Sequence, residues 1–140
     1  MEFEAAIGDW QDGYMSVSIT LEKTRVTYTS FEELEQCAPR YKQRSQWVVN
    51  RDLTDPDERE RVQMFFAWML EHMRLARDNY PSDPRFARDS AIGGVNWSFI
   101  LWTDERIYTT GGRSGTPAWW DDACARISEI VDFDLNAYTA

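Results

Sequence analysis

Residues 14–29 have the sequence Y-M-S-V-S-I-T-L-E-K-T-R-V-T-Y-T, and their pattern sets the expected fold class. Apolar and polar residues alternate along the first half, as in a strand with one buried face. The segment Glu22-Lys23-Thr24 is short enough to be a hairpin turn, and the alternation resumes over residues 25–29. Because a tight hairpin joins antiparallel strands, we expect an antiparallel sheet.

A second hairpin is expected in the C-terminal half of the chain. Apolar and polar residues alternate over Val95–Trp102, residues 103–105 form the turn, and Arg106–Thr110 returns as a strand. Shorter alternating stretches over Phe3–Ile7 and Gln46–Asn50 predict two further strands. The sequence thus supplies strands on both sides of its central region.

The central region carries the strongest helical pattern. Pro56 suits the first turn of a helix, and either Thr54 or Asp55 suits its cap. Apolar residues recur at helical spacing, so we expect a helix from Pro56 to about Asn79. A long loop is expected after it, over Tyr80–Gly94. The buried stripe of this helix would consist of Val62, Phe65, Phe66, Met69, Leu70, Met73 and Ala76.

Two shorter helices are also expected. Ser30 is a suitable N-cap for a helix over Phe31–Cys37, because acids fill its first turn. Thr116 and Pro117 are suitable to cap and open a C-terminal helix that continues over Ala118–Val131. The buried stripe of the C-terminal helix would consist of Trp120, Cys124, Ile127 and Val131.

The order of these elements defines the expected architecture. Hairpins with short turns imply antiparallel pairing rather than a doubly wound sheet. We therefore expect an α+β fold, in which an antiparallel sheet built from two hairpins packs against one long helix and a C-terminal helix. A length of 140 residues fits a single domain over residues 1–140.

The charge of the chain restricts its partners. Fifteen basic residues stand against 24 acidic ones, for a net charge of −9, which argues against direct binding of nucleic acid. The longest apolar run, Met64–Leu70, is far shorter than the roughly 20 residues of a membrane span. With two isolated cysteines and no signal-peptide pattern at the start, we expect a cytoplasmic protein that does not bind membranes.

Residues suited to catalysis are few. The chain has one histidine, His72, and two cysteines, Cys37 and Cys124, in no metal-binding spacing. The glycine-rich segment Thr110–Thr116 lacks the lysine of a phosphate-binding loop, so it is interpreted as the turn between a strand and a helix, with Gly111–Gly115 ending the strand. We therefore expect no catalytic site, no metal and no cofactor.

Acids next to tryptophans form the candidate partner-binding site. Trp102 precedes Asp104 and Glu105 at the second hairpin turn. Aromatic anchors flanked by carboxylates suit an interface with a basic protein. We expect this group to form the main contact together with Trp119, Asp121 and Asp122 at the start of the C-terminal helix, and Glu58 and Glu60 to support it.

Two alternatives remain open at this stage. The acidic residues can simply form a solvated surface that keeps the domain soluble. A second apolar row of the long helix, consisting of Met64, Trp68 and Leu75, can instead join two copies of the chain as a homodimer. In that case the chain would be a non-catalytic interaction or assembly domain.

The profile of the whole chain resembles that of small acidic inhibitor proteins of phages and bacteria. Anti-CRISPR proteins and the immunity proteins of nuclease toxins share this small size, acidity and lack of catalytic residues. The resemblance implies an inhibitor that binds and blocks a nuclease or CRISPR effector, in part as a mimic of nucleic acid. The segment W-S-F-I-L-W-T-D-E-R-I-Y-T-T-G-G over residues 97–112, with Pro117 and the last helix, also resembles the C-terminal layout of small bacterial metalloprotease inhibitors, which implies protease inhibition as an alternative.

Overall fold

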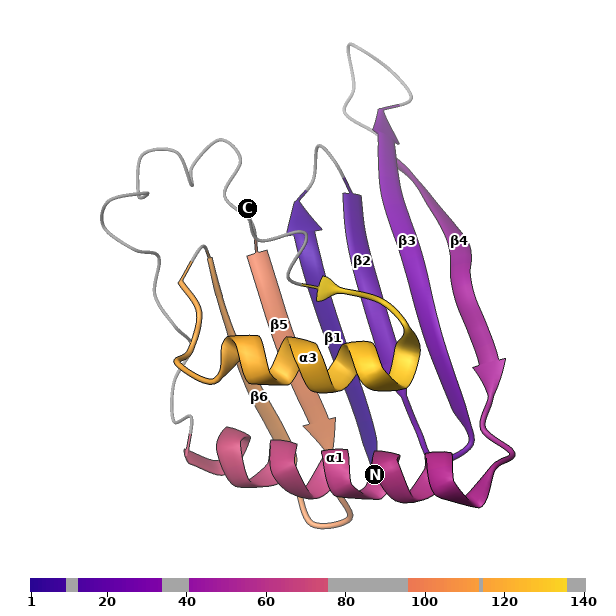
Figure 1. Cartoon of the computed structure of the whole chain (residues 1–140). Coiled ribbons are helices and arrows are strands. Elements are labelled where there is room, and N and C mark those ends of the chain that lie inside the picture. Colours follow the sequence, from indigo (N-terminus) through magenta and orange to yellow (C-terminus); the bar gives the residue numbers. More distant parts are fainter. Residues whose placement is uncertain (10–12, 34–40, 76–95, 114, 136–140) are drawn as a thin grey trace.

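A computed structural model describes residues 1–9, 13–33, 41–75, 96–113 and 115–135 (Figure 1). Within these ranges the chain forms six strands and two helices. In chain order they are β1 (Glu2–Asp9), β2 (Gly13–Ile19), β3 (Lys23–Glu33), β4 (Tyr41–Asp52), α1 (Pro56–Leu75), β5 (Asn96–Trp102), β6 (Ile107–Arg113) and α3 (Trp120–Val131).

The strands form one antiparallel sheet in the order β4-β3-β2-β1-β5-β6. The first four strands follow each other as neighbours, and β5 and β6 form the second hairpin. Antiparallel pairing of β1 with β5 joins the two parts, with Phe3 opposite Leu101 and Ala5 opposite Phe99. The α+β class and the antiparallel sheet with one long and one C-terminal helix are therefore confirmed.

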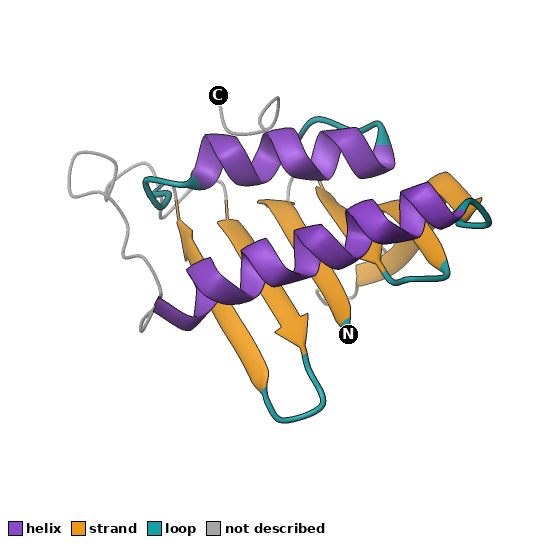
Figure 2. Ribbon diagram, turned by 60° about the horizontal axis from the view of Figure 1, so that its bottom comes forward, coloured by secondary structure: helices purple, strands orange, loops and turns teal. Residues whose placement is uncertain are grey.

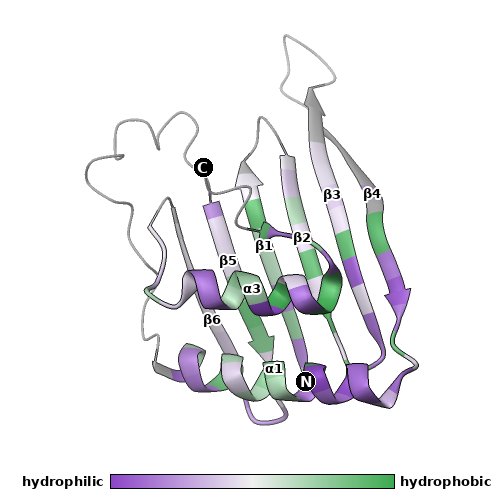
Figure 3. Ribbon diagram, viewed as in Figure 1, coloured by the Kyte–Doolittle hydropathy of each residue, from purple (hydrophilic) through white to green (hydrophobic). Residues whose placement is uncertain are grey.

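Both helices lie on the same face of the sheet (Figure 2). The inward side chains of the strands meet the apolar stripes of α1 and α3, and Figure 3 shows these apolar stretches on neighbouring strands. Aromatic rings fill much of this core: Phe99 stacks on Trp120 with ring centroids 5.2 Å apart, and Phe3 meets Phe65 edge-on at 5.0 Å. Burial of these large rings supplies the main driving force for packing the helices on the sheet.

The opposite face of the sheet carries no helix in the described part of the chain (Figure 2). Side chains alternate between the two faces of a strand. Because Phe3, Ala5 and Ile7 of β1 are buried beneath the helices, Glu2 and Glu4 project from the other face. We call this other side the uncovered face.

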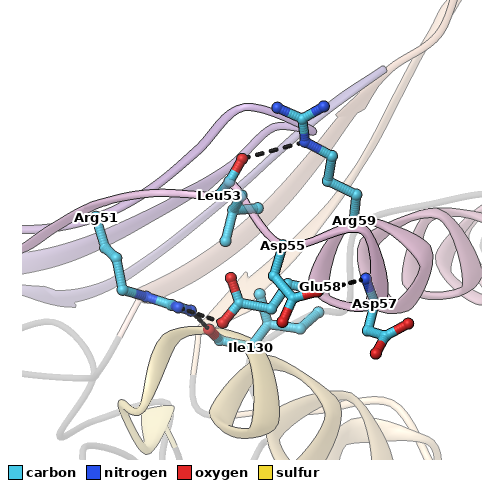
Figure 4. A network of polar contacts seen from close by, with 7 residues as sticks. All are labelled: Arg51, Leu53, Asp55, Asp57, Glu58, Arg59 and Ile130. Carbon is cyan, nitrogen blue, oxygen red and sulfur yellow. Dashed lines mark hydrogen bonds and ion pairs between the residues drawn. The ribbon is translucent and has the colours of Figure 1, made fainter.

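A polar network ties the start of α1 to its neighbours (Figure 4). The backbone N–H of Asp57 donates to Oδ1 of Asp55 over 2.9 Å, so Asp55 caps the helix. The guanidinium of Arg51, on β4, reaches Glu58 of α1 at 2.6 Å and the backbone carbonyl of Ile130 in α3 at 2.9 Å. One side chain therefore links the edge strand to both helices.

The expected helix over Phe31–Cys37 is wrong in the part that the structure describes. Residues 31–33 continue β3, and they pair with β4 through Phe31–Gln43 and Glu33–Tyr41. Residues 34–37, with Cys37, lie outside the described residues. The acids after Ser30 resemble a helix start, but β4 is twelve residues long, and its ladder with β3 outweighs this local preference.

The strand β6 and the helix α3 also differ from expectation at their ends. Gly111 does not end β6, which runs to Arg113 and pairs with the start of β5. The helix starts later than predicted, with Trp119 rather than Thr116 at the cap position and no side-chain capping hydrogen bond. The expected loop over Tyr80–Gly94 and the predicted end of the long helix, residues 76–79, lie outside the described residues.

Candidate functional site

Trp102 is the last residue of β5, and it lies on the uncovered face. The chain then turns at Thr103, whose hydroxyl donates to the carbonyl of Arg106 over 2.7 Å and accepts from the Arg106 N–H over 3.1 Å. This tight turn places Asp104 and Glu105 at its tip, where both carboxylates are exposed. Trp102, Asp104 and Glu105, which the sequence analysis grouped at this hairpin, therefore lie close together in the structure.

Strand pairing adds further residues around this tryptophan. On one side Glu2 of β1 lies directly opposite Trp102, and Glu4 lies opposite Ile100. On the other side Ile107 of β6 lies opposite Trp102 and is 58% exposed. Paired residues point to the same face of a sheet. We call the resulting surface the Trp102 face; it consists of Glu2, Glu4, Ile100, Trp102 and Ile107, and the turn with Asp104 and Glu105 adjoins it.

The Trp102 face holds a carboxylate in an unfavourable setting. Partial burial raises the pKa of Glu4 above its ordinary value, and the neighbouring charge of Glu2 raises it further. Desolvation and a like charge both disfavour the ionised form of a carboxyl group. A positive group placed between these two carboxylates would offset both effects.

A shallow pocket of about 390 Å³ adjoins this surface and shares Glu2 with it. Its charged lining is mixed, because it holds two basic residues, Lys23 and Arg25, as well as acids. Lys23 pairs with Asp52 at 3.5 Å. The pocket extends the polar surface from β1 toward the ends of β2, β3 and β4. Its lining residues are Glu2, Ser18, Thr20, Glu22, Lys23, Arg25 and Asp52.

The other half of the predicted interface lies on the helix side of the sheet. Trp119 is half-buried against the core, with its ring 6.0 Å from Trp68 and 6.0 Å from Phe99. Asp121 and Asp122 are exposed in the first turn of α3.

The four predicted acids therefore do not form one patch. Trp120 contacts Trp97 near the start of β5, with ring centroids 5.0 Å apart, whereas Asp104 and Glu105 follow the end of that strand. The sheet and its length separate the two groups of acids. Trp119 also differs from Trp102, because its ring is part of the core packing.

The two supporting acids at the start of α1 have different surroundings. Glu58 lies in the first turn of α1 and forms the ion pair with Arg51 already described. Glu60 is exposed. Both lie on the helix side, away from the Trp102 face.

The apolar row suggested for a homodimer is interrupted. Met64 is 64% exposed, but the indole of Trp68 is covered by Arg126 at 4.5 Å and by the His72 ring at 3.9 Å. The side chain of Leu75 lies outside what the structure describes. The described residues of the row thus offer one exposed methionine rather than a continuous apolar strip.

Several arginines of the described chain are engaged in contacts within the molecule. Arg51 binds Glu58 and the Ile130 carbonyl, and Arg59 donates to the carbonyl of Leu53 over 3.1 Å. Arg106 lies over the Tyr108 ring at 5.1 Å, as Arg126 does over Trp68. In contrast, Asp104, Glu105 and Asp122 have no ion pair with any described residue.

Chemically reactive side chains are few in the described ranges. Cys124 is buried, and burial raises the pKa of its thiol to about 12, with further contributions from Asp134 and Asp121. A thiol with such a pKa carries almost no thiolate at neutral pH.

The glycine-rich turn is fixed by Trp97, whose Nε1–H donates to the carbonyl of Gly115 over 2.6 Å. Among the described residues, no group of three or more His, Cys, Asp or Glu side chains could hold a metal ion.

The sequence did not single out Glu2, Glu4 and Ile107, which belong to the Trp102 face. Their signal lies in the pairing of β5 with β1 on one side and with β6 on the other, which brings them beside Trp102. Alternation alone assigns them to one side of a strand, but it does not say which strand is the neighbour.

No protein-family model matches the chain, and no curated protein matches it either. Neither α1 nor α3 has the length and apolar composition that crossing a bilayer requires.

Proposed function

We propose that this protein is a small, non-catalytic inhibitor that acts in the cytoplasm. Its partner is a protein effector that handles nucleic acid, such as a nuclease toxin or a CRISPR effector. The protein would bind the basic groove of that effector through an acidic surface containing a tryptophan, and so compete with nucleic acid without binding it directly.

One observation carries this proposal: several arginines of the described chain contact its own residues, whereas Asp104 and Glu105 are exposed and form no ion pair with a described residue. Arg51, Arg59, Arg106 and Arg126 contact the chain itself, whereas Asp104 and Glu105 project from a turn. With a net charge of −9 over the whole chain, these exposed carboxylates contribute to a negative surface. Such a surface favours encounter with a positively charged partner.

Carboxylates suit competition with nucleic acid because they can occupy sites that bind phosphates. Arginine binds both groups through paired hydrogen bonds, so a groove built for a phosphate backbone also accepts aspartate and glutamate. The partly exposed ring of Trp102 adds apolar contact area beside these acids. Charge would attract the partner, and the tryptophan would slow its dissociation.

The test begins with affinity capture from the lysate of a cell that encodes the protein. The bound proteins are identified by mass spectrometry, and the purified partner is then assayed with and without the inhibitor. We expect a nucleic-acid enzyme whose activity falls to a low level at a one-to-one ratio. Capture of proteins unrelated to nucleic acid, or a captured enzyme that keeps its activity, would contradict the proposal.

Self-association and protease inhibition are the alternatives to this function. The interrupted Met64 and Trp68 row gives self-association less support, since Trp68 is covered by Arg126. Sedimentation of the purified protein distinguishes the first alternative, because a stable dimer at micromolar concentration would favour an assembly role. Inhibition of a metalloprotease by the purified protein would favour the second.

A further inference from the structure

We propose that the Trp102 face binds an extended, arginine-rich segment that lines the partner's basic groove, with one guanidinium held between Glu2 and Glu4 and stacked on Trp102. This inference depends on the proposed function, because it names the surface and the partner chemistry through which inhibition would occur. It places the interface on the uncovered side of the sheet rather than around α3.

The spacing of the side chains fits a guanidinium. Residues two apart on a strand project to the same side about 6.6 Å from each other, so Glu2 and Glu4 can flank one planar cation. Trp102 lies directly opposite Glu2 on β5. A guanidinium can form hydrogen bonds with carboxylates in its plane while its face lies on an indole.

The electrostatic setting of Glu4 favours such an occupant. Partial burial and the neighbouring charge of Glu2 both raise its pKa, so both disfavour its ionised form. A positive charge at this point would offset both effects. The charge of the site and the charge of the proposed segment are therefore complementary.

Apolar residues complete the surface. Ile100 lies opposite Glu4, and Ile107, 58% exposed, lies opposite Trp102. The methylene stem of an arginine packs on such residues while its head group reaches the carboxylates. Asp104 and Glu105 at the turn would meet further basic residues of an extended segment.

The helix side offers no comparable combination in the described chain. Trp119 and Trp68 are in contact with each other and with the core. Arg126 covers Trp68, so a cation already occupies the position that an incoming arginine would take. Asp121 and Asp122 are exposed acids without an adjacent free aromatic ring.

The experiment uses the full chain labelled with ¹⁵N and a blocked peptide of alternating glycine and arginine, with matched lysine and glutamate peptides. The variants are Glu2→Gln/Glu4→Gln, Trp102→Phe and Trp102→Ala. The control Asp121→Asn/Asp122→Asn removes the same amount of charge from the other side. Amide spectra of each variant verify that it is folded before binding is measured.

We expect the arginine peptide to shift the Trp102 indole signal and the amides of β1 and β5. Binding should weaken about tenfold in Glu2→Gln/Glu4→Gln, which corresponds to the loss of one or two charge-assisted contacts. It should change less than about twofold in the control, because exposed charges elsewhere are screened. Trp102→Phe should retain more binding than Trp102→Ala, and the lysine peptide should bind more weakly.

Equal weakening in the control, shifts confined to α1 and α3, or no binding of the arginine peptide would overturn the inference. The two proposals also fail separately. An effector that is captured and inhibited equally well by Glu2→Gln/Glu4→Gln would refute the Trp102 face while leaving the inhibitor function. A peptide that maps to the Trp102 face of a protein that inhibits no effector would refute the function while leaving the face.

Discussion

Glu2 and Trp102 lie directly opposite each other on β1 and β5, on the face of the sheet that carries no helix in the described chain. The pairing places a carboxylate beside a partly exposed indole, although the two residues come from distant parts of the sequence. The tryptophans on the other side of the sheet differ from Trp102, because their rings contribute to the core packing. The first prediction follows from this difference.

Trp119→Ala should destabilise the protein far more than Trp102→Ala. Trp119 contacts Trp68, His72 and Phe99, so its removal leaves a cavity between α1, α3 and β5. We expect a loss of about 3 kcal/mol in the free energy of unfolding, and less than about 1 kcal/mol for Trp102→Ala. Urea unfolding followed by circular dichroism measures both. Equal losses would mean that Trp102 contributes to the core.

Glu4→Gln should change how stability depends on pH. The pKa of Glu4 is raised in the folded protein, so the stability that proton binding supplies is present below about pH 4.5 and is lost as pH rises through the folded pKa. Glutamine resembles the neutral carboxyl at every pH.

The variant should therefore match the original protein near about pH 4 and exceed it slightly at neutral pH, by less than about 0.5 kcal/mol. Unfolding by urea across this pH range gives the difference. Glu105→Gln is the control, since its carboxylate is exposed at the turn. A variant that is less stable than the original at neutral pH would contradict the stated cause of the pKa shift.

Arg51→Ala should loosen the contact between β4 and both helices. The substitution removes the 2.6 Å pair with Glu58 and the 2.9 Å bond to the Ile130 carbonyl. We expect a loss of about 1 kcal/mol, because the side chain is partly exposed and water replaces part of each contact. Lys23→Ala removes the 3.5 Å pair with Asp52 and serves as the control, with a loss below about 0.5 kcal/mol. A larger effect in the control would refute the linking role of Arg51.

Cys124 should react slowly with thiol reagents in the folded protein. Its thiol is buried, and its pKa is raised to about 12, so little thiolate forms at about pH 8. Mass spectrometry after treatment with iodoacetamide separates labelling of Cys124 from labelling of Cys37. We expect Cys124 to be labelled only after unfolding. Rapid labelling in the native state would show that the residue is accessible.

The architecture follows from local patterns in most of the described chain. Alternation predicted β2 and β5 closely, because each has one face packed on the helices. The predicted stripe of α1 is buried at Val62, Phe65 and Phe66, where helical spacing and burial agree. Prediction failed where local and distant preferences compete, as at the end of β3, whose acids favour a helix start but whose partner β4 extends the ladder.

For the candidate site too, only residues close together in the sequence could be predicted to lie together. Trp102, Asp104 and Glu105 are neighbours in the sequence, so their proximity could be predicted. Glu2 and Glu4 join them only through the pairing of β1 with β5, which periodicity does not specify. The predicted proximity of Trp119 to Trp102 was wrong, because the Trp119 ring lies on the opposite side of the sheet and packs on the core.

The salt dependence of partner binding decides whether the Trp102 face binds its partner by charge. The dissociation constant of the captured effector is measured by calorimetry between about 0.05 M and about 0.5 M NaCl, for the original protein and for Glu2→Gln/Glu4→Gln. If the Trp102 face binds a basic groove by charge, affinity should fall about tenfold or more over this range, and the variant should bind more weakly and with a smaller salt slope. An affinity that is indifferent to salt, or a variant with unchanged affinity and slope, would contradict this mode of binding.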